Sequence, residues 1–100
     1  MRKLLFSIER LEFVGGGQAL LAGRCCRDLM KAGDEARLIV SRENDGRFET
    51  SEPIVMRFPE FEVYGRKLSE LEPGLTAGVL IPNEVATGLR FGWYLKGENA

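Results

Sequence analysis

The chain has 100 residues, close to the commonest size of one domain, so we expect a single domain spanning residues 1–100. Its 14 basic and 15 acidic side chains nearly cancel to a net charge of -1, which argues against a protein held on nucleic acid by bulk charge alone. Because the sequence contains no histidine, it lacks the usual base of a serine or cysteine nucleophile and the commonest transition-metal ligand. We therefore predict no enzyme activity, no catalytic residues, no metal site and no cofactor.

The cysteines and the apolar runs indicate a cellular compartment. Cys25 and Cys26 are adjacent and would point to opposite faces of a strand, so we expect free thiols in a reducing environment. A secretory signal needs an apolar run of about 7 to 15 residues, whereas Glu9, Arg10 and Glu12 interrupt the opening run. No segment approaches the roughly 18 apolar residues of a membrane span. We expect a cytoplasmic protein with no membrane contact.

The first two predicted strands flank a run of glycines. Residues 3–14 fit a strand with one phase slip near Glu9 and Arg10, and residues 18–27 alternate small and apolar residues, as a tightly curved barrel strand does. Between them the glycines predict a tight hairpin turn. A second interpretation is that their successive backbone amides form an anion-binding nest for a phosphate. The glycines of this run are Gly15, Gly16 and Gly17.

A turn at Gly33 and Asp34 leads into a third predicted strand over residues 35–41. The polar residues 42–53 are expected to form a loop or insertion, in which the chain turns back at Asp45.

Three further apolar segments complete the predicted strands. Residues 53–65 alternate in two phases, with Pro59 at the slip, so we expect a bulge or break there. Residues 75–83 and 89–95 alternate as core strands, the second placing Phe91 among the buried residues. Six or seven short strands separated by turns predict an all-β protein, a small closed or partly open antiparallel barrel.

A series of turn and strand positions runs through the chain: Gly15 to Gly17, Gly23 and Arg24, Leu29 and Met30, Gly33 to Ala36, Gly74, Ala77 and Gly78, and Arg90 to Gly92. In the order of these turns and strands, from about residue 11 to residue 95, the chain resembles the second domain of elongation factor Tu and of related translational GTPases. The resemblance implies a translation-factor barrel and contacts with transfer RNA and ribosomal RNA. The chain departs from that pattern in about a dozen extra residues around positions 42–53. No G-x-x-x-x-G-K-[ST] phosphate loop occurs in it, so the resemblance implies neither GTP binding nor hydrolysis.

Four basic residues are the predicted nucleic-acid contacts. They would lie near one another if the second and third predicted strands pair as a hairpin, and they would then contact phosphates. Equally, they would be solvent-exposed partners of nearby carboxylates, since exposed ion pairs are common and weak. These residues are Arg24, Arg27, Lys31 and Arg37.

An aromatic surface is predicted near the end of the chain. If Trp93 follows Phe91 into the core, Tyr94 faces solvent together with Arg90 and Lys96. Such a patch suits base stacking or protein docking, whereas the alternative is an isolated surface tyrosine. The sequence thus predicts a non-catalytic binding module that associates with RNA or the ribosome. The alternative is a protein-interaction module that uses a barrel edge or the aromatic patch.

Overall fold

The computed structural model describes residues 1–41, 43–44, 47–48 and 50–100. Within them the chain is built almost entirely of strands, with one short helix, α1 (Asn83–Ala86), between the last two. The strands are β1 (Arg2–Gly15), β2 (Gln18–Cys25), β3 (Met30–Lys31), β4 (Glu35–Val40), β5 (Glu43–Asn44), β6 (Arg47–Phe48), β7 (Ser51–Arg57), β8 (Phe61–Val63), β9 (Arg66–Leu68), β10 (Glu70–Leu71), β11 (Thr76–Pro82) and β12 (Tyr94–Asn99).

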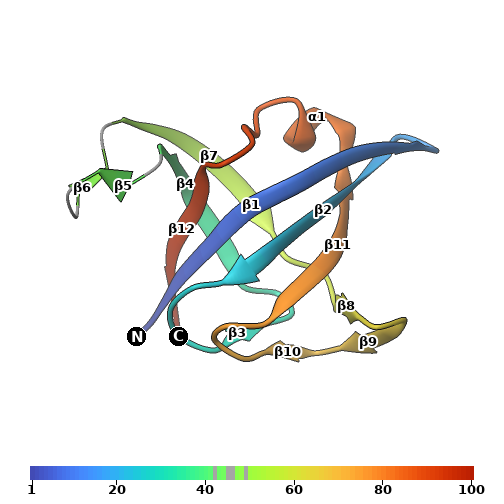
Figure 1. Ribbon diagram of the computed structural model, residues 1–100, viewed down its shortest axis with the longest axis horizontal. Coiled ribbons are helices and arrows are strands. Elements are labelled where there is room, and N and C mark those ends of the chain that lie inside the picture. The colour runs from blue at the N-terminus through green and yellow to red at the C-terminus, as the bar shows by residue number, and fades with distance from the viewer. Residues whose placement is uncertain (42, 45–46, 49) are drawn as a thin grey trace.

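In the described part of the chain, eight strands form one antiparallel sheet in the order β7-β4-β12-β1-β2-β11-β8-β9. The sheet curls around a single core, and two small sheets, β3 with β10 and β5 with β6, lie at its margins (Figure 1). The predicted all-β, partly open antiparallel barrel is confirmed. The main sheet has more strands than the six or seven expected, because the exposed residues of β9 show no apolar alternation that would reveal a strand.

The first hairpin has the predicted turn and the predicted phase slip. In β1, Ile8 pairs with Gly23 and Arg10 pairs with Ala22, so Glu9 is the extra residue of a β-bulge. The three turn glycines have φ values of 90°, 66° and 76°, which residues with a Cβ rarely adopt. The long hairpin that results projects beyond the rest of the sheet in Figure 1.

The core is built from inward-facing strand residues, with three phenylalanines among its largest buried side chains. Phe6 and Phe58 lie edge to face with ring centroids 5.2 Å apart, and Phe61 packs beside them. A Cβ at Gly23 would collide with the carbonyl oxygen of Ser7 and with the Phe6 ring, so only glycine allows β2 to approach β1 this closely.

The turn between β3 and β4 is stabilised by hydrogen bonds to a buried carboxylate. Asp34, whose side chain is 8% exposed, accepts hydrogen bonds from Arg2 Nη1 at 2.5 Å and Nη2 at 2.8 Å, and from the Lys31 amide at 2.8 Å. The Asp34 carbonyl accepts a hydrogen bond from the Phe58 amide at 2.8 Å, while Arg2 also donates to the carbonyl of Ala100. The Arg2 side chain therefore connects both ends of the chain to the turn that contains Asp34.

The pKa of the Asp34 carboxyl reflects opposing effects. Burial raises this pKa, but the hydrogen bonds from Arg2 and the Lys31 amide, together with the charges of Arg2 and Lys31, lower it by more. The pKa of Asp34 therefore lies below its usual value, and the ionised carboxylate stabilises the fold at neutral pH.

Three expectations differ from the structure. Strand β4 pairs with β7 and β12, not with β2. The predicted strand 89–95 begins only at Tyr94, because Gly92, at φ 82°, belongs to a turn closed by the Trp93 amide and the Arg90 carbonyl. The chain is a strand from Ser51 onward, inside the stretch 42–53 expected to be loop, whereas the turn expected at Asp45 lies outside the described residues.

The break expected at Pro59 is confirmed, since β7 ends at Arg57 and β8 starts at Phe61. In the portion of the chain that the structure describes, no helix has the length and apolar character needed to cross a membrane.

We predict that Asp34→Asn destabilises the protein by about 3 kcal/mol at pH 7, because it leaves the Arg2 guanidinium without its anionic partner. The pKa of an Asp in the unfolded chain is about 3.9, and the pKa of the native Asp34 carboxyl is lower, so the stabilisation is fully present above the unfolded pKa. It is lost as the pH falls through the lowered native pKa. Urea unfolding of both forms between pH 7 and pH 2 would show the difference shrinking below about pH 4.

Glu12→Gln, which breaks only the exposed Arg10–Glu12 pair, is the control and should change stability by less than about 1 kcal/mol. A difference between wild type and Asp34→Asn that stays constant down to pH 2 would contradict the role given to the carboxylate.

We predict that Gly23→Ala costs about 3 kcal/mol of stability, since the new Cβ meets backbone at Ser7 that cannot move without disrupting the β1–β2 pairing. Gly78→Ala is the matched control, because its Cβ would approach only the flexible end of Leu20, at 3.2 Å. Urea denaturation of both variants provides the comparison. Equal stabilities would show that the close approach of β2 to β1 at Gly23 does not require glycine.

Candidate nucleic-acid interface

The outer face of β2, β1 and β12 carries a row of three polar side chains. Ser7 lies directly opposite Arg24 on one side and Tyr94 on the other. Their sequence neighbours Ile8, Gly23 and Leu95 are buried in the core, so alternation turns the row outward. The row therefore brings a residue of the predicted basic cluster beside one of the predicted aromatic patch.

A second row lies two residues further along each strand, about 7 Å away. In it Lys96 pairs with Leu5 on β1 and with Leu38 on β4. Tyr94 and Lys96 thus share one face of β12, as the sequence indicated.

The turn before β12 places an aromatic ring in solvent. Phe91 is 78% exposed, which contradicts its predicted place in the core. With Tyr94 it lines an open cavity of about 370 Å³ over β1, whose remaining walls are Ser7, Ile8, Glu9 and Gly92. Gly92, directly after Phe91, is the sequence signal that would have shown a turn here.

Arg90 lies beside this turn and is tied to neighbours. Its guanidinium lies 4.9 Å from the centroid of the Trp93 ring, a cation–π contact, and its Nη2 lies 3.3 Å from a Glu52 carboxylate oxygen. Trp93 itself packs against the core, as predicted. Arg90 therefore supports the turn that presents Phe91.

A second open cavity, of about 410 Å³, lies further along β12. Lys96, Arg37 and Leu38 line it together with Gly97 and Glu98. Arg37 is therefore brought next to Lys96, although the two residues are far apart in the sequence.

The four predicted basic residues do not form one cluster. Their proximity depended on pairing between β2 and the strand from residue 35, which is wrong because β1 and β12 lie between these strands. Arg24 and Arg37 border opposite sides of the face. Each forms an exposed ion pair: Arg24 lies 3.9 Å from Glu9, and Arg37 lies 3.4 Å from Glu35. Arg27 and Lys31 are exposed elsewhere and line neither cavity.

The glycine run serves as a hairpin turn. Gly15 pairs with Gln18, and the Gly17 carbonyl accepts a hydrogen bond from the Asn83 amide at 3.0 Å. The space around all three glycines is open. An anion-binding role for Gly15, Gly16 and Gly17 stays a prediction.

The cysteines are both free thiols, Cys25 buried and Cys26 exposed. Burial raises the pKa of the Cys25 thiol, which donates a hydrogen bond to the Asp28 carbonyl at 3.2 Å. Among the described residues, no group of three or more His, Cys, Asp or Glu side chains could hold a metal ion.

No family model matches the sequence, and no curated protein matches it. Two solved structures of translation elongation factor SelB from Methanococcus maripaludis are similar in fold, one the apo form and one in complex with the GTP analogue GppNHp. Each aligns over 100% of this chain with a TM-score of 0.69 and 13% sequence identity, and each match covers 21% of the SelB chain. The resemblance to translation factors is thus confirmed at the level of structure: the chain has the fold of a translation-factor β-barrel domain.

Proposed function

We propose that this chain is a non-catalytic binding module of translation that contacts unpaired bases of RNA through the outer face of β2, β1 and β12. The observation that carries the proposal is the exposed Phe91 ring beside the Arg24–Ser7–Tyr94 row. The similarity in fold to part of SelB supports a translation-related role.

Stacking on aromatic rings would supply most of the affinity. An unpaired base stacked on an aromatic ring contributes about 1–3 kcal/mol, and Phe91 presents its ring beside an open cavity that Tyr94 also lines. Duplex RNA offers no such base faces, since its bases are stacked on one another. We therefore expect a preference for single strands.

Phosphate contacts would contribute a smaller share. Arg24, Lys96 and Arg37 border the face, and neutralising three phosphates of a single strand corresponds to a slope of about -2 in log affinity against log salt concentration. With a whole-chain charge of -1, this local contribution is not reinforced by the rest of the molecule.

We predict that Phe91→Ala weakens the binding of a 12-nucleotide single-stranded RNA by about tenfold, as expected for one lost stacking contact. Arg24→Glu with Arg37→Glu should weaken it at least as much and flatten the salt dependence. Fluorescence anisotropy between 25 and 200 mM salt measures both effects. The proposal is wrong if duplex and single strand bind equally or if Phe91→Ala binds like wild type.

The matched control is Arg27→Glu with Lys31→Glu, which makes the same change of charge at residues away from both cavities. It should weaken binding clearly less than the Arg24 and Arg37 double variant. Equal weakening by the two pairs would show that overall charge, and not this face, governs the interaction.

The alternative function is protein interaction through a barrel edge. Strand β7 is an edge of the eight-stranded sheet over seven residues, and its Val55 is exposed, so it offers backbone groups for the addition of a partner strand. Such an interface would be insensitive to salt and to the arginine substitutions, so the same titrations separate the two functions.

A further inference from the structure

A groove with a floor of small residues crosses the outer face of β11, apart from the RNA-binding face proposed above. The pairing register places Lys67, Glu62, Gly78, Ala22 and Arg10 in one row across β9, β8, β11, β2 and β1. Because Gly78 and Ala22 lie in the middle of this row and charged side chains lie at its ends, the surface is lowest at its centre.

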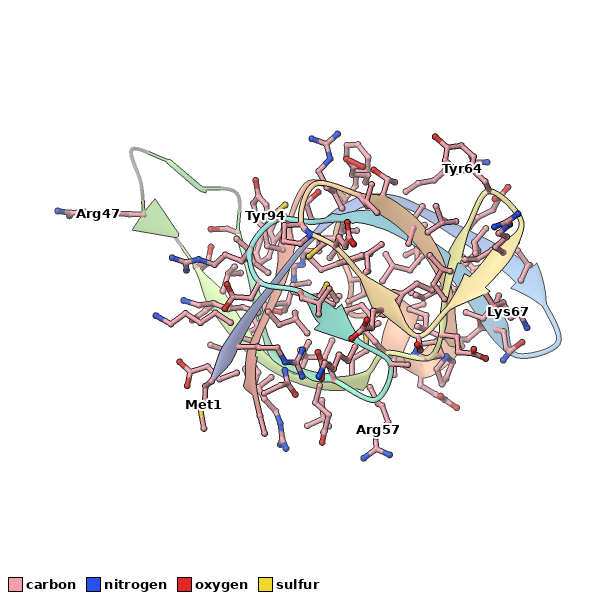
Figure 2. All side chains as sticks on the ribbon, turned by 90° about the horizontal axis from the view of Figure 1, so that it is seen from below. Met1, Arg47, Arg57, Tyr64, Lys67 and Tyr94 are labelled. Atoms are coloured by element: carbon pink, nitrogen blue, oxygen red, sulfur yellow. The ribbon has the colours of Figure 1, made fainter. Side chains whose placement is uncertain are left out.

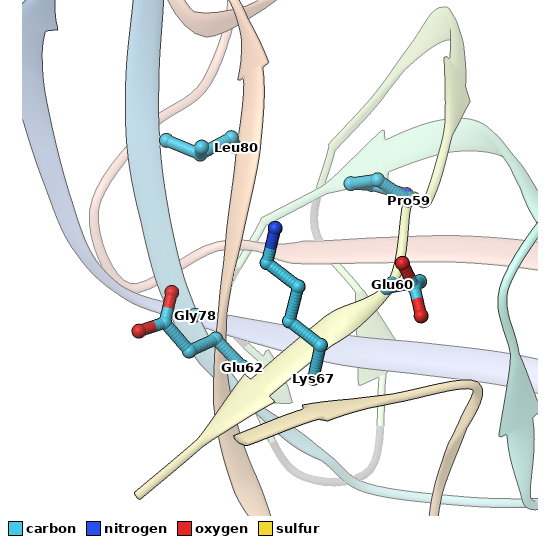
Figure 3. A pocket seen from close by; sticks show the side chains of 6 residues that line it. All are labelled: Pro59, Glu60, Glu62, Lys67, Gly78 and Leu80. Atoms are coloured by element: carbon cyan, nitrogen blue, oxygen red, sulfur yellow. The ribbon is translucent and has the colours of Figure 1, made fainter. Parts of the chain in front are cut away.

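The groove contains a pocket of about 120 Å³, which Figure 3 shows from close by. Gly78 forms its floor and Leu80, 43% exposed, and Pro59 form apolar walls. This volume is somewhat smaller than the roughly 150 Å³ of a cavity that holds benzene, so the pocket is sized for one aliphatic side chain.

The rim of the pocket is acidic on one side. The side chains of Glu60 and Glu62 make no hydrogen bond or ion pair within the described residues, and the same holds for the side chain of Lys67, which lies between them in Figure 3. Across the floor, Arg10 is already paired with Glu12 at 3.2 Å. A rim with an excess of carboxylates repels a polyanion such as RNA and attracts a cationic side chain.

The hairpin that carries this rim also presents a strained aromatic residue. Tyr64 is completely exposed and has φ 51°, and it is the one non-glycine residue with positive φ in the described chain. A residue other than Gly, Asn or Asp pays about 1 kcal/mol or more for this conformation, and the exposed ring recovers none of it by packing. Figure 2 shows that Tyr64 and Lys67 both lie toward the end of the molecule opposite Arg47.

We propose that this groove docks a segment of a partner protein in which an aliphatic side chain is followed closely by Lys or Arg. The aliphatic side chain enters the pocket over Gly78, and the cation pairs with Glu60 and Glu62. In this proposal the segment also reaches Tyr64, at the turn of the same hairpin, because exposed tyrosines are frequent anchors of such interfaces. The proposal is independent of RNA binding, since the groove shares no lining residue with either cavity of the other face.

The test uses a phage-displayed library of random 12-residue peptides, selected on the immobilised full chain. We expect enrichment of peptides with Leu, Ile or Met within three positions of Lys or Arg. Gly78→Val, which fills the pocket, and Glu60→Gln with Glu62→Gln, which removes the acidic rim, should each weaken an enriched synthetic peptide by at least about tenfold in calorimetry.

Glu70→Gln with Glu72→Gln is the matched control, because it removes two exposed carboxylates at the same spacing away from the groove. Circular dichroism establishes that each variant is folded. The proposal is overturned if no peptide is enriched, if the enriched peptides are acidic, or if the groove variants bind them as wild type does. It is also overturned if the 12-nucleotide RNA, and no peptide, shifts the amide resonances of Gly78 and Leu80.

Discussion

The hydrogen bonds between Arg2 and Asp34 hold the barrel at the point where both chain ends meet. Arg2 is the first residue of β1 and pairs with Asn99, the last residue of β12. Because Asp34 holds Arg2 in place, this contact sets the register between the two strands. The Asp34 turn in addition bonds with Phe58, beyond the end of β7. The rows of the outer face follow from this register, because the alignment of Ser7 with Tyr94 depends on the pairing that begins at Arg2.

The bulge at Glu9 lets one strand of fourteen residues serve two surfaces. Before the bulge, Ser7 points outward beside Tyr94, and after it Arg10 points outward at the edge of the groove. If residues 8–11 instead alternated as a regular strand with no bulge, Arg10 would point into the core and Leu11 would point to solvent. The phase slip that is visible in the sequence therefore allows the proposed nucleic-acid face and the proposed docking groove to share β1 and β2.

Patterns among neighbouring residues predicted the turns and strands, but they did not predict which strands pair with each other. Glycine turns, alternating strands and the break at Pro59 depend on neighbouring residues, and each was predictable. The neighbours of β4 are set by contacts with residues more than ten positions away, which alternation does not encode, so the basic cluster was placed wrongly. Phe91 was misplaced for another reason: its apolar spacing continued that of β12, but Gly92 ends the alternation with a turn.

Exposure separates the largely buried ion pair of Arg2 from the exposed ion pairs of Arg24 and Arg37. The Arg2–Asp34 side chains are 22% and 8% exposed, and separating them would leave a largely buried charge without a partner. The side chains of Arg24 and Arg37 are 55% and 62% exposed, and exposed pairs contribute about 0–1 kcal/mol. A phosphate can therefore replace Glu9 or Glu35 at little cost, whereas none can replace Asp34. A guanidinium thus stabilises the barrel at Arg2, whereas the guanidinium groups of Arg24 and Arg37 can exchange their partners.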